Sequence, residues 1–429
     1  MITRRDFIAG LAAGSVALGL NSSSWAATPL RVRSVRSGPW SSAGTWEGGQ
    51  LPAAGCVVTV RPGHEVLYDV DSRVPVRMLH IQGRVVFARD RDTRLDVGLI
   101  KIGGVATEDG ANFMAQRAPV PIPRPALLVG TPDQPIPVPH TALIRLVYFA
   151  GFDRDTLPAI ECCGGRMELH GAPLSRTWVK LGAPVRRGDR EVVLSGPVSG
   201  WREGDRIILT ATTRQIINLK QPELDTFKES VRDLTQTEER FIAAITGARL
   251  MLDRPADFDH ICSGPYRGEV ANLSRNVIVE SADPAARGHT MYHHGSAGSI
   301  SYAEFRRLGK RGTLGRYMLH FHLVRDSMRG SSVIGASLWD SENRWLTVHG
   351  TDYLVVRDCV GYNSIGHGFF LEDGTEVFNV FDRNLAVQGR TGRPLPGQVL
   401  PFDHNSGSGF WWANSLNTFT RNVACECDV

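Results

Sequence analysis

The sequence lacks a strong charge of either sign, a second long apolar run and a zinc-like spacing of cysteines. Its 48 basic and 44 acidic residues give a formal net charge of +4, which is too small and too evenly spread for a surface that binds nucleic acid. No run approaches the ~18 apolar residues of a membrane span. With 42% hydrophobic residues over 429 positions, the chain is nevertheless expected to fold around a large core.

The cysteines are odd in number, and their spacing is not that of zinc ligands. A chain of this size does not need disulfides to stabilise it. We therefore expect the cysteines to pack as small apolar side chains. The seven are Cys56, Cys162, Cys163, Cys262, Cys359, Cys425 and Cys427.

Glycine is the residue in excess. Its 45 copies make up roughly one residue in ten, against a usual ~7%, and they lack the period of collagen. A chain that turns this often is expected to be all-β. Glycine and asparagine tolerate the left-handed backbone dihedrals that sharp corners require, so we expect them at such corners.

The first segment is predicted to be a targeting signal rather than part of the fold. Arg4 and Arg5 directly precede an apolar stretch at residues 7–20, and small residues follow it. This order is typical of a twin-arginine signal peptide, here residues 1–27, and an ordinary secretory signal is the alternative. Either one predicts a periplasmic or secreted protein without a stable membrane span after cleavage.

Short alternating strands follow the signal segment. Residues 31–140 alternate apolar and polar side chains between Gly, Pro and Asp turns, which indicates a β domain that ends in a proline-rich stretch. Residues 141–275 show the same pattern and are predicted to form a linking β region. One polar excursion of helical character interrupts it at residues 221–240.

Residues 276–429 repeat an apolar strand followed by an Asn/Asp/Gly turn, at intervals of about 21 to 26 residues. A repeat of this length, with two or three short strands in each unit, predicts a right-handed parallel β-helix whose stacked coils bury a continuous core. The predicted fold class is therefore all-β, with a right-handed parallel β-helix preceded by a glycine-rich β domain.

Motifs in both regions resemble one known family. From Ser37 onward, the segments SGPWSSAGTWEGGQLPAAGCVVTVRPGHEVLYDV, LHIQGRVVF and GLIKIGG resemble the eight-glycine (G8) domain. Later segments are similar, in the same order, to the β-helix signatures of the cell-migration-inducing hyaluronidase and its transmembrane relative. They are LGRYMLHFHLVRD, LTVHGTDYLVVRDCVGYNSIGHGFFLEDGTE, NVFDRNLAV and FDHNSGSGFWWANSLN. The resemblance implies a bacterial member of this hyaluronan-depolymerising family.

Two departures from the family pattern limit this comparison. The interval between Val387 and Asp403 is shorter than in the animal proteins, which is expected to remove a loop near the site. The chain also stops at Val429, where family members continue through further coils. Because a β-helix that ends in mid-coil exposes a sheet edge, we expect the β-helix of this sequence to be incomplete.

Histidines within the matching motifs are the first candidates for chemistry. On a strand, His320 and His322 share one face, with Cβ atoms about 7 Å apart, a spacing that suits one metal ion or one sugar ring. Alignment of the coils by their glycines stacks His349 on Asp373 and then on Asn414, about 4.8 Å apart, so that a carboxylate would orient the imidazole for acid/base work. The alternative for both groups is a structural role at a coil corner.

The adjacent carboxylates Glu372 and Asp373 are expected to point to opposite faces of a strand. A glycosidase therefore requires a different partner for Asp373, such as Asp352, Asp326 or Asp403. A polysaccharide lyase requires instead a base together with arginine or Ca²⁺ to neutralise a uronate.

Basic and aromatic side chains near these motifs are candidates for substrate binding. Arg311 and Arg316, in a cluster with Arg306 and Arg307, could hold carboxylates bidentately. The rings predicted to stack on sugars are Tyr317, Trp411 and Trp412.

The sequence thus favours an exported protein that binds and cleaves an acidic, uronate-containing polysaccharide. A non-catalytic carbohydrate-binding or adhesion protein and a β-helix polysaccharide lyase are the alternatives. No metal is assigned, and Ca²⁺ is the only cofactor considered. The predicted catalytic residues are His349, Asp373, His320, His322, His367, Asp352 and Asp403.

Overall fold

The computed structural model describes residues 29–104, 123–213 and 235–429. The predicted signal peptide and residues 221–234 of the polar excursion lie outside these ranges. Helix is confined, in the described part, to the short 3-10 turns η1 (Ala43–Thr45), η2 (Glu47–Gly49) and η4 (Asp326–Met328). None of the helices in these ranges is long and apolar enough to cross a bilayer.

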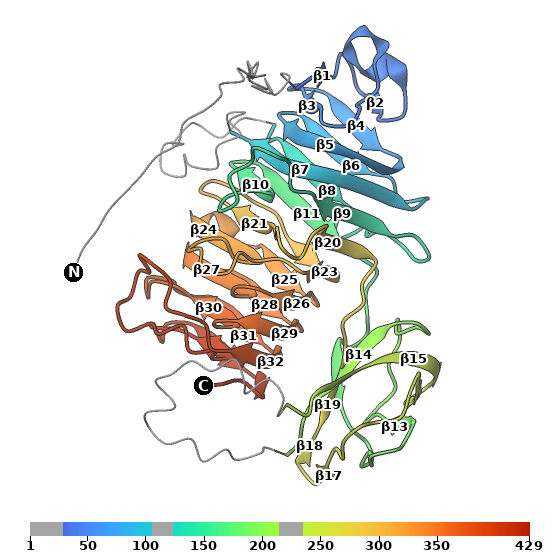
Figure 1. Ribbon diagram of the computed structural model, residues 1–429, viewed down its shortest axis with the longest axis vertical. Coiled ribbons are helices and arrows are strands. Elements are labelled where there is room, and N and C mark those ends of the chain that lie inside the picture. The colour runs from blue at the N-terminus through green and yellow to red at the C-terminus, as the bar shows by residue number, and fades with distance from the viewer. Residues whose placement is uncertain (1–28, 105–122, 214–234) are drawn as a thin grey trace, which may run out of the picture.

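Three parallel ladders of strands run side by side through the molecule, as Figure 1 shows from blue to red. The first ladder contains β1 (Arg31–Arg33), β3 (Val57–Val60), β5 (Asp71–Ile81), β7 (Thr93–Gly103), β10 (Ala159–Cys163), β21 (His289–Tyr292), β24 (Leu319–Arg325), β27 (Leu346–Thr351), β30 (Phe369–Leu371) and β33 (Phe410–Trp411). The second contains β9 (Ala142–Leu146), β20 (Val277–Ser281), β23 (Ala303–Arg306), β26 (Ser337–Ser341), β29 (Val360–Ile365), β32 (Leu385–Arg390) and β35 (Val423–Cys425). The third contains β2 (Gly38–Pro39), β4 (Glu65–Tyr68), β6 (Arg84–Phe87), β8 (Ala126–Val129), β11 (Arg166–His170), β22 (Ile300–Ser301), β25 (Ser332–Ile334), β28 (Val355–Arg357), β31 (Val380–Asp382) and β34 (Thr418–Thr420).

These ladders enclose one continuous apolar core, which confirms the parallel β-helix. The core includes Val58 near its beginning, Ile160 in the middle and Phe381 towards its end. Strands of residues 31–163 stack on the same ladders as strands of residues 277–425. The sequence suggested that the β-helix begins near residue 276, but its coils begin at β1. The glycine-rich region therefore supplies the first coils of the same stack.

Coil length agrees with the repeat found in the sequence only in part. In the third ladder Val333 pairs with Val356, 23 positions later, and Val356 pairs with Phe381, 25 positions later. Other coils are longer, because loops at residues 307–318 and 391–409 interrupt them. These two loops fold over the outer face of the first ladder, where the candidate site lies.

The corners of the coils repeat a left-handed backbone conformation. Two columns, each with one residue from five successive coils, have φ between 48° and 63°. Their members are Arg307, Asp340, Asn363, Gln388 and Glu426 in one column, and Tyr302, Gly335, Asp358, Arg383 and Arg421 in the other. The expectation that glycine and asparagine occupy such corners was wrong for eight of these ten positions. Paired strands on either side hold the larger residues in a conformation that costs about 1–2 kcal/mol each.

Some glycines instead make room for buried rings. A Cβ atom on Gly361 would lie 2.3 Å from the indole of Trp345, and one on Gly368 would lie 2.4 Å from the same ring. Trp345 is fully buried in the core. The glycine excess therefore reflects close packing inside the coils as well as turns.

Buried asparagines form ladders between coils. The side-chain oxygen of Asn384 accepts a hydrogen bond from the Cys359 N–H at 3.0 Å, and its Nδ2 donates to the Val356 carbonyl at 3.1 Å and to Asn422 Oδ1 at 3.0 Å. Asn379 makes an equivalent set at another corner. Each amide thus satisfies backbone groups that the corner removes from the strand ladders.

Residues between β11 and β20 form a separate antiparallel side sheet, visible beside the later coils in Figure 1. Its strands are β12 (Trp178–Lys180), β19 (Glu269–Asn272), β14 (Arg206–Leu209), β15 (Glu238–Thr246), β16 (Arg249–Leu252) and β13 (Glu191–Val193), with the hairpin β17 (Cys262–Ser263) and β18 (Tyr266–Arg267) nearby. Trp178 and Ile208 of this sheet pack against Trp339 and Tyr362 of the coils. The helical character expected at residues 221–240 is wrong for residues 238–240, which begin β15.

We predict that Asn384→Ala lowers the free energy of unfolding by about 1–3 kcal/mol, because it leaves the buried Cys359 N–H without its acceptor. Denaturant unfolding measures this change. The control is Asn422→Ala, whose side chain is partly exposed, so that water can replace its bonds and the loss stays below ~1 kcal/mol. Equal losses in the two variants would contradict the structural role of the buried amide.

Candidate functional site

Histidines from successive coils form a row on the outer face of the first ladder. The strand register pairs His322 of β24 with His349 of β27, and His293 directly follows β21 at the same position. The ring centroids of His293 and His322 lie 5.6 Å apart, and those of His322 and His349 lie 4.9 Å apart. Parallel stacking thus converts single histidines of three coils into one continuous row.

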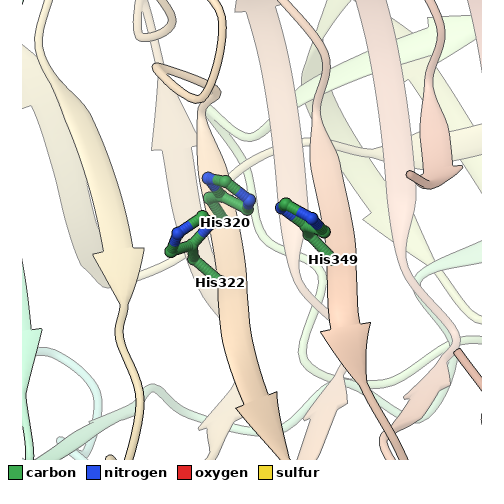
Figure 2. A group of neighbouring side chains, drawn as sticks. All are labelled: His320, His322 and His349. Carbon is green, nitrogen blue, oxygen red and sulfur yellow. The ribbon is translucent and has the colours of Figure 1, made fainter. Parts of the chain in front are cut away.

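His320 joins this row from the side. It lies two residues before His322 on β24, and Figure 2 shows both rings on one side of the strand with the His349 ring beside them. The centroids of His320 and His322 are 5.0 Å apart, as expected for residues that share a face. His320 is buried, and its Nδ1–H donates to the carbonyl of Gly315 at 3.0 Å. Burial, with the neighbouring rings, holds the pKa of His320 well below its usual value.

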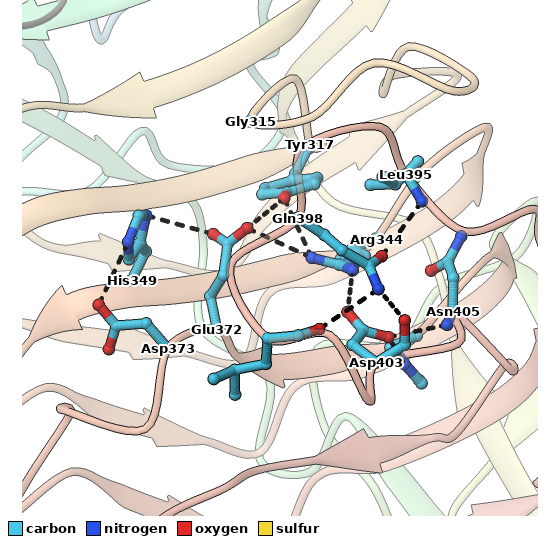
Figure 3. A network of polar contacts seen from close by, with 12 residues as sticks. Gly315, Tyr317, Arg344, His349, Glu372, Asp373, Leu395, Gln398, Asp403 and Asn405 are labelled. Atoms are coloured by element: carbon cyan, nitrogen blue, oxygen red, sulfur yellow. Dashed lines mark hydrogen bonds and ion pairs between the residues drawn. The ribbon is translucent and has the colours of Figure 1, made fainter.

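Two carboxylates meet the His349 ring. Its Nδ1 lies 3.3 Å from Oε2 of Glu372, and its Nε2 lies 3.3 Å from Oδ2 of Asp373 (Figure 3). Burial lowers the pKa of His349, but the contact with Asp373 and the charge of Glu372 outweigh it and raise that pKa. The same contact, with hydrogen bonds from Thr375, holds the pKa of Asp373 below its usual value despite the opposing effect of burial.

The register differs by one residue from the one expected. Val348 pairs with Leu371, which places His349 opposite Glu372 rather than opposite Asp373. β30 ends at Leu371, so strand alternation no longer separates the two carboxylates and both reach one imidazole. The prediction that Glu372 and Asp373 cannot serve the same site was therefore wrong. Asn414, the third member of the expected column, donates to the Gly374 carbonyl at 3.1 Å instead.

Glu376 holds the turn that carries Asp373. Its carboxylate accepts hydrogen bonds from the backbone N–H groups of Gly350, Asp373 and Gly374 at 2.9–3.1 Å. Burial raises the pKa of Glu376 to about 7. Asp373 is thereby fixed beside His349 by backbone contacts as well as by its own charge.

A buried polar network lies directly behind the cluster (Figure 3). The Tyr317 hydroxyl donates to Oε1 of Glu372 at 2.5 Å, and Nη1 of Arg344 donates to the Tyr317 hydroxyl at 3.0 Å. Nη2 of Arg344 donates to Asp403 at 2.6 Å, and Nε2 of His367 donates to the same carboxylate at 2.8 Å. The network ties the loops at residues 307–318 and 391–409 to the coils.

Several predicted site residues belong to this network rather than to an accessible surface. Tyr317 and His367 are fully buried, and Asp403 is only 3% exposed. Both ring nitrogens of His367 are occupied, because its Nδ1 accepts from the Ser408 N–H. The prediction that Tyr317 stacks on a sugar is wrong for this structure, and His367 and Asp403 hold the site in place.

The remaining predicted residues are dispersed. Asp352 accepts a hydrogen bond from the Val377 N–H at 2.9 Å, so it stabilises a turn instead of joining Asp373. Arg316 is buried, whereas Arg311 is exposed and forms an ion pair with Glu342. Arg306 and Arg307 form ion pairs with Glu280. Of the two tryptophans, Trp411 is partly buried against Phe370, and Trp412 stacks on Phe419. The arginine cluster thus does not form a single binding surface.

The sequence reasoning missed Arg344 and set Glu372 aside. Arg344 precedes β27 as a lone arginine with no pattern to mark it, although it is fully buried. The alternation of side chains along a strand placed Glu372 on the face opposite Asp373, because the strand was expected to continue past Leu371. The Glu-Asp-Gly sequence that follows Leu371 is a turn signal, and it could have corrected that assignment.

We predict that Arg344→Met lowers the free energy of unfolding by about 3–5 kcal/mol, because Asp403 and Glu372 would remain buried without their cation. The matched control is Arg311→Met, which removes an exposed ion pair and is expected to cost below ~1 kcal/mol. Thermal and denaturant unfolding measure both variants. Similar losses would show that burial of the Arg344 network contributes little.

The same network predicts a dependence on pH. Burial alone raises the pKa of Asp403, but the hydrogen bond from His367 and the charge of Arg344 outweigh it and hold that pKa below its usual value. A carboxylate of this kind stabilises the fold above the unfolded pKa of about 4 and loses that contribution as the pH falls. The stability gap between wild type and Asp403→Asn should therefore be larger at pH 7 than at pH 3, and a constant gap would contradict this assignment.

A cleft of about 490 Å³ lies apart from the histidines, between the side sheet and the coils. Trp178 forms part of its wall, and none of the described residues that line it is acidic. The cationic residues that line it are Arg176, Lys180, Arg267, Arg383 and Arg421. Arg383 and Arg421 also form ion pairs with Asp358 and Asp382 of the coils.

Comparison with known proteins agrees with this architecture. The G8 domain family matches residues 45–182, and the CEMIP beta-helix family matches residues 286–429. The chain therefore carries a region that matches the G8 domain and a region that matches the CEMIP β-helix, as its motifs predicted.

Among individual relatives, fibrocystin-L of Homo sapiens is 26% identical over 449 residues, covering 90% of this chain and 9% of the relative. Communication mutant protein F of Dictyostelium discoideum is 30% identical over 279 residues, covering 61% of this chain and 24% of the relative. The chain thus spans a small part of these proteins.

Phage tailspikes are among the solved structures with a detectable likeness. The tailspike gp49 of Pseudomonas phage LKA1 is 10% identical, with a TM-score of 0.26 over 84% of this chain and 50% of that chain. The Gp54 tailspike of Acinetobacter baumannii bacteriophage AP22, solved in complex with a capsular saccharide, is 8% identical, with a TM-score of 0.20 over 86% of this chain and 53% of that chain.

Proposed function

We propose that this protein binds and cleaves an acidic, uronate-containing polysaccharide on the coil face that carries the histidine row. The observation that supports the proposal most directly is the position of His349, a partly exposed imidazole held between Asp373 and Glu372. An imidazole oriented by a carboxylate is a common arrangement for proton transfer. The match to the CEMIP beta-helix family is consistent with a glycan substrate, and the predicted twin-arginine signal would direct the protein to act outside the cytoplasm.

The accessible and buried parts of the cluster would have different roles. His349 and Asp373 each have side chains 14% exposed, whereas Glu372 is 3% exposed. His349 and Asp373, as the accessible pair, would carry the proton transfer at the scissile bond, and Glu372 would fix the orientation of the imidazole from the buried side. In hydrolysis water adds across the glycosidic C–O bond. In elimination a base removes the proton beside the uronate carboxylate, and the C–O bond at the neighbouring carbon breaks.

We predict that His349→Ala and Asp373→Asn each lower the rate of uronate-polymer cleavage by about 100-fold or more, because a positioned proton-transfer group contributes about 10²–10⁴. Polymer binding is expected to change little. Chain length after incubation with hyaluronan and related uronate polymers measures cleavage, and ultraviolet absorbance of the products separates elimination from hydrolysis.

The control variant is Asp326→Asn, an exposed carboxylate on η4 at the end of the preceding coil strand. It should cleave at the wild-type rate. If the wild-type protein binds uronate polymers without shortening them, the enzymatic proposal fails and binding alone remains. If His349→Ala cleaves normally, the reaction site lies elsewhere.

The cationic cleft favours a second function, retention of an anionic polymer without cleavage. Arg176 is exposed, and the Lys180 side chain is 41% exposed, so both can pair with carboxylates of a bound chain. The cleft lies on a different side of the coils from the histidine row. Binding of a polymer in this cleft would therefore not depend on a reaction at His349.

We predict that the double variant Arg176→Glu/Lys180→Glu weakens binding of a uronate polymer by about 10-fold or more at low salt, where exposed charges are least screened. The control is Arg186→Glu/Arg254→Glu, which makes the same charge change at exposed sites on the side sheet outside the cleft. Titration at two salt concentrations measures the difference. Equal weakening in both variants would assign the effect to net charge alone.

A further inference from the structure

We propose that His320, His322, His349 and Glu372 bind one divalent transition-metal ion, of which zinc is the representative. The three histidines each present a nitrogen, and these nitrogens all lie within 4.8 Å of one another. They come from two neighbouring strands, as Figure 2 shows, and Glu372 follows the third. The inference concerns the site of the proposed reaction but does not rest on it, because metal binding needs no substrate.

The spacing of the donors fits a tetrahedral ion. Zinc–nitrogen and zinc–oxygen bonds of about 2.0–2.1 Å place neighbouring ligand atoms about 3.3–3.4 Å apart. Oε2 of Glu372 lies 3.3 Å from Nδ1 of His349 and 3.6 Å from Nε2 of His320. These two separations are therefore close to those around a bound ion.

Two of these atoms face each other as acceptors. The Nδ1–H of His320 is used by the Gly315 carbonyl, so the neutral ring presents a lone pair at Nε2. That nitrogen and Oε2 of Glu372 are both buried, and neither has a hydrogen-bond partner in the part of the chain that the structure describes. Buried acceptors that converge without a donor are costly, and a cation between them removes the cost.

The outer contacts are those that orient metal ligands. Metal-bound histidines usually donate their second N–H to a carbonyl or a carboxylate. Here His320 donates to Gly315, and Nε2 of His349 faces Asp373 at 3.3 Å. Oε1 of Glu372 is held by Tyr317 and Arg344, which leaves Oε2 directed at the histidines.

The donor set selects the class of metal. Imidazole nitrogens suit zinc, copper, nickel and iron, whereas Ca²⁺ prefers six to eight oxygen ligands. Three histidines and one carboxylate thus disfavour the Ca²⁺ considered from the sequence. His322 and His349 are partly exposed, so an ion can enter the site from solvent.

The test is metal binding by the full chain after treatment with a chelator. Calorimetry with Zn²⁺ and visible absorption with Co²⁺ should each show one equivalent bound, with cobalt bands of tetrahedral intensity. His322→Ala should weaken zinc binding by about 100-fold or more. Asp373→Asn, which removes an orienting contact, should weaken it by about 10–100-fold.

The control is His294→Ala, an exposed histidine beside the row but outside the donor set. It should bind zinc as wild type does, and zinc should raise the melting temperature of this variant but not that of His322→Ala. Absence of stoichiometric zinc and cobalt binding would overturn the inference, as would equal binding by His322→Ala and His294→Ala. Zinc binding without polymer cleavage would support the metal site and reject the proposed enzyme, whereas cleavage by a protein that binds no zinc would support the enzyme and reject the metal site.

Discussion

The structure depends on in-register parallel pairing between successive coils. Hydrogen bonds between neighbouring strands fix each coil about 4.8 Å from the next, so a residue on one coil lies directly above its equivalent on another. Side chains at equivalent positions of successive coils therefore form rows along the axis of the β-helix. The buried amides of Asn379 and Asn384, the corner columns and the histidine row all arise from this constraint, which makes linear arrays out of residues far apart in sequence.

Two loops divide the outer face of the first ladder into a closed part and an open part. Under the loops, Arg344 and the carboxylates of Glu372 and Asp403 are almost completely buried. Such charges are tolerated because each meets an opposite charge or a hydrogen-bond donor. Beside the loops, His322 and His349 keep contact with solvent. Glu372 belongs to both parts, since one of its oxygens is held by the buried network and the other faces the histidines.

Much of this arrangement could be predicted from the sequence, and the reasons for the failures are physical. The shared face of His320 and His322 follows from strand alternation alone. The contact of His349 with Asp373 was also expected, although through the wrong register, because the coils were aligned by their glycines, whereas the strands pair Val348 with Leu371. Arg344 was missed because its burial depends on partners in loops that are distant from it in the sequence. The start of the β-helix was misplaced because the repeat is interrupted: Val57 pairs with Met78 and Met78 with Leu99, each 21 positions later, but Leu99 pairs with Ala159, 60 positions later.

The left-handed corners have a consequence for the way in which the molecule comes apart. Residues such as Gln388 and Arg383 hold an unfavourable backbone conformation only while the coils on either side stay paired with theirs. When one coil separates, its corners relax and the adjacent coil loses half of its support. Unfolding should then advance from coil to coil as a moving boundary, as in other stacked repeats. Resistance to unfolding would accordingly be set by the weakest pair of adjacent coils rather than by the total size of the core.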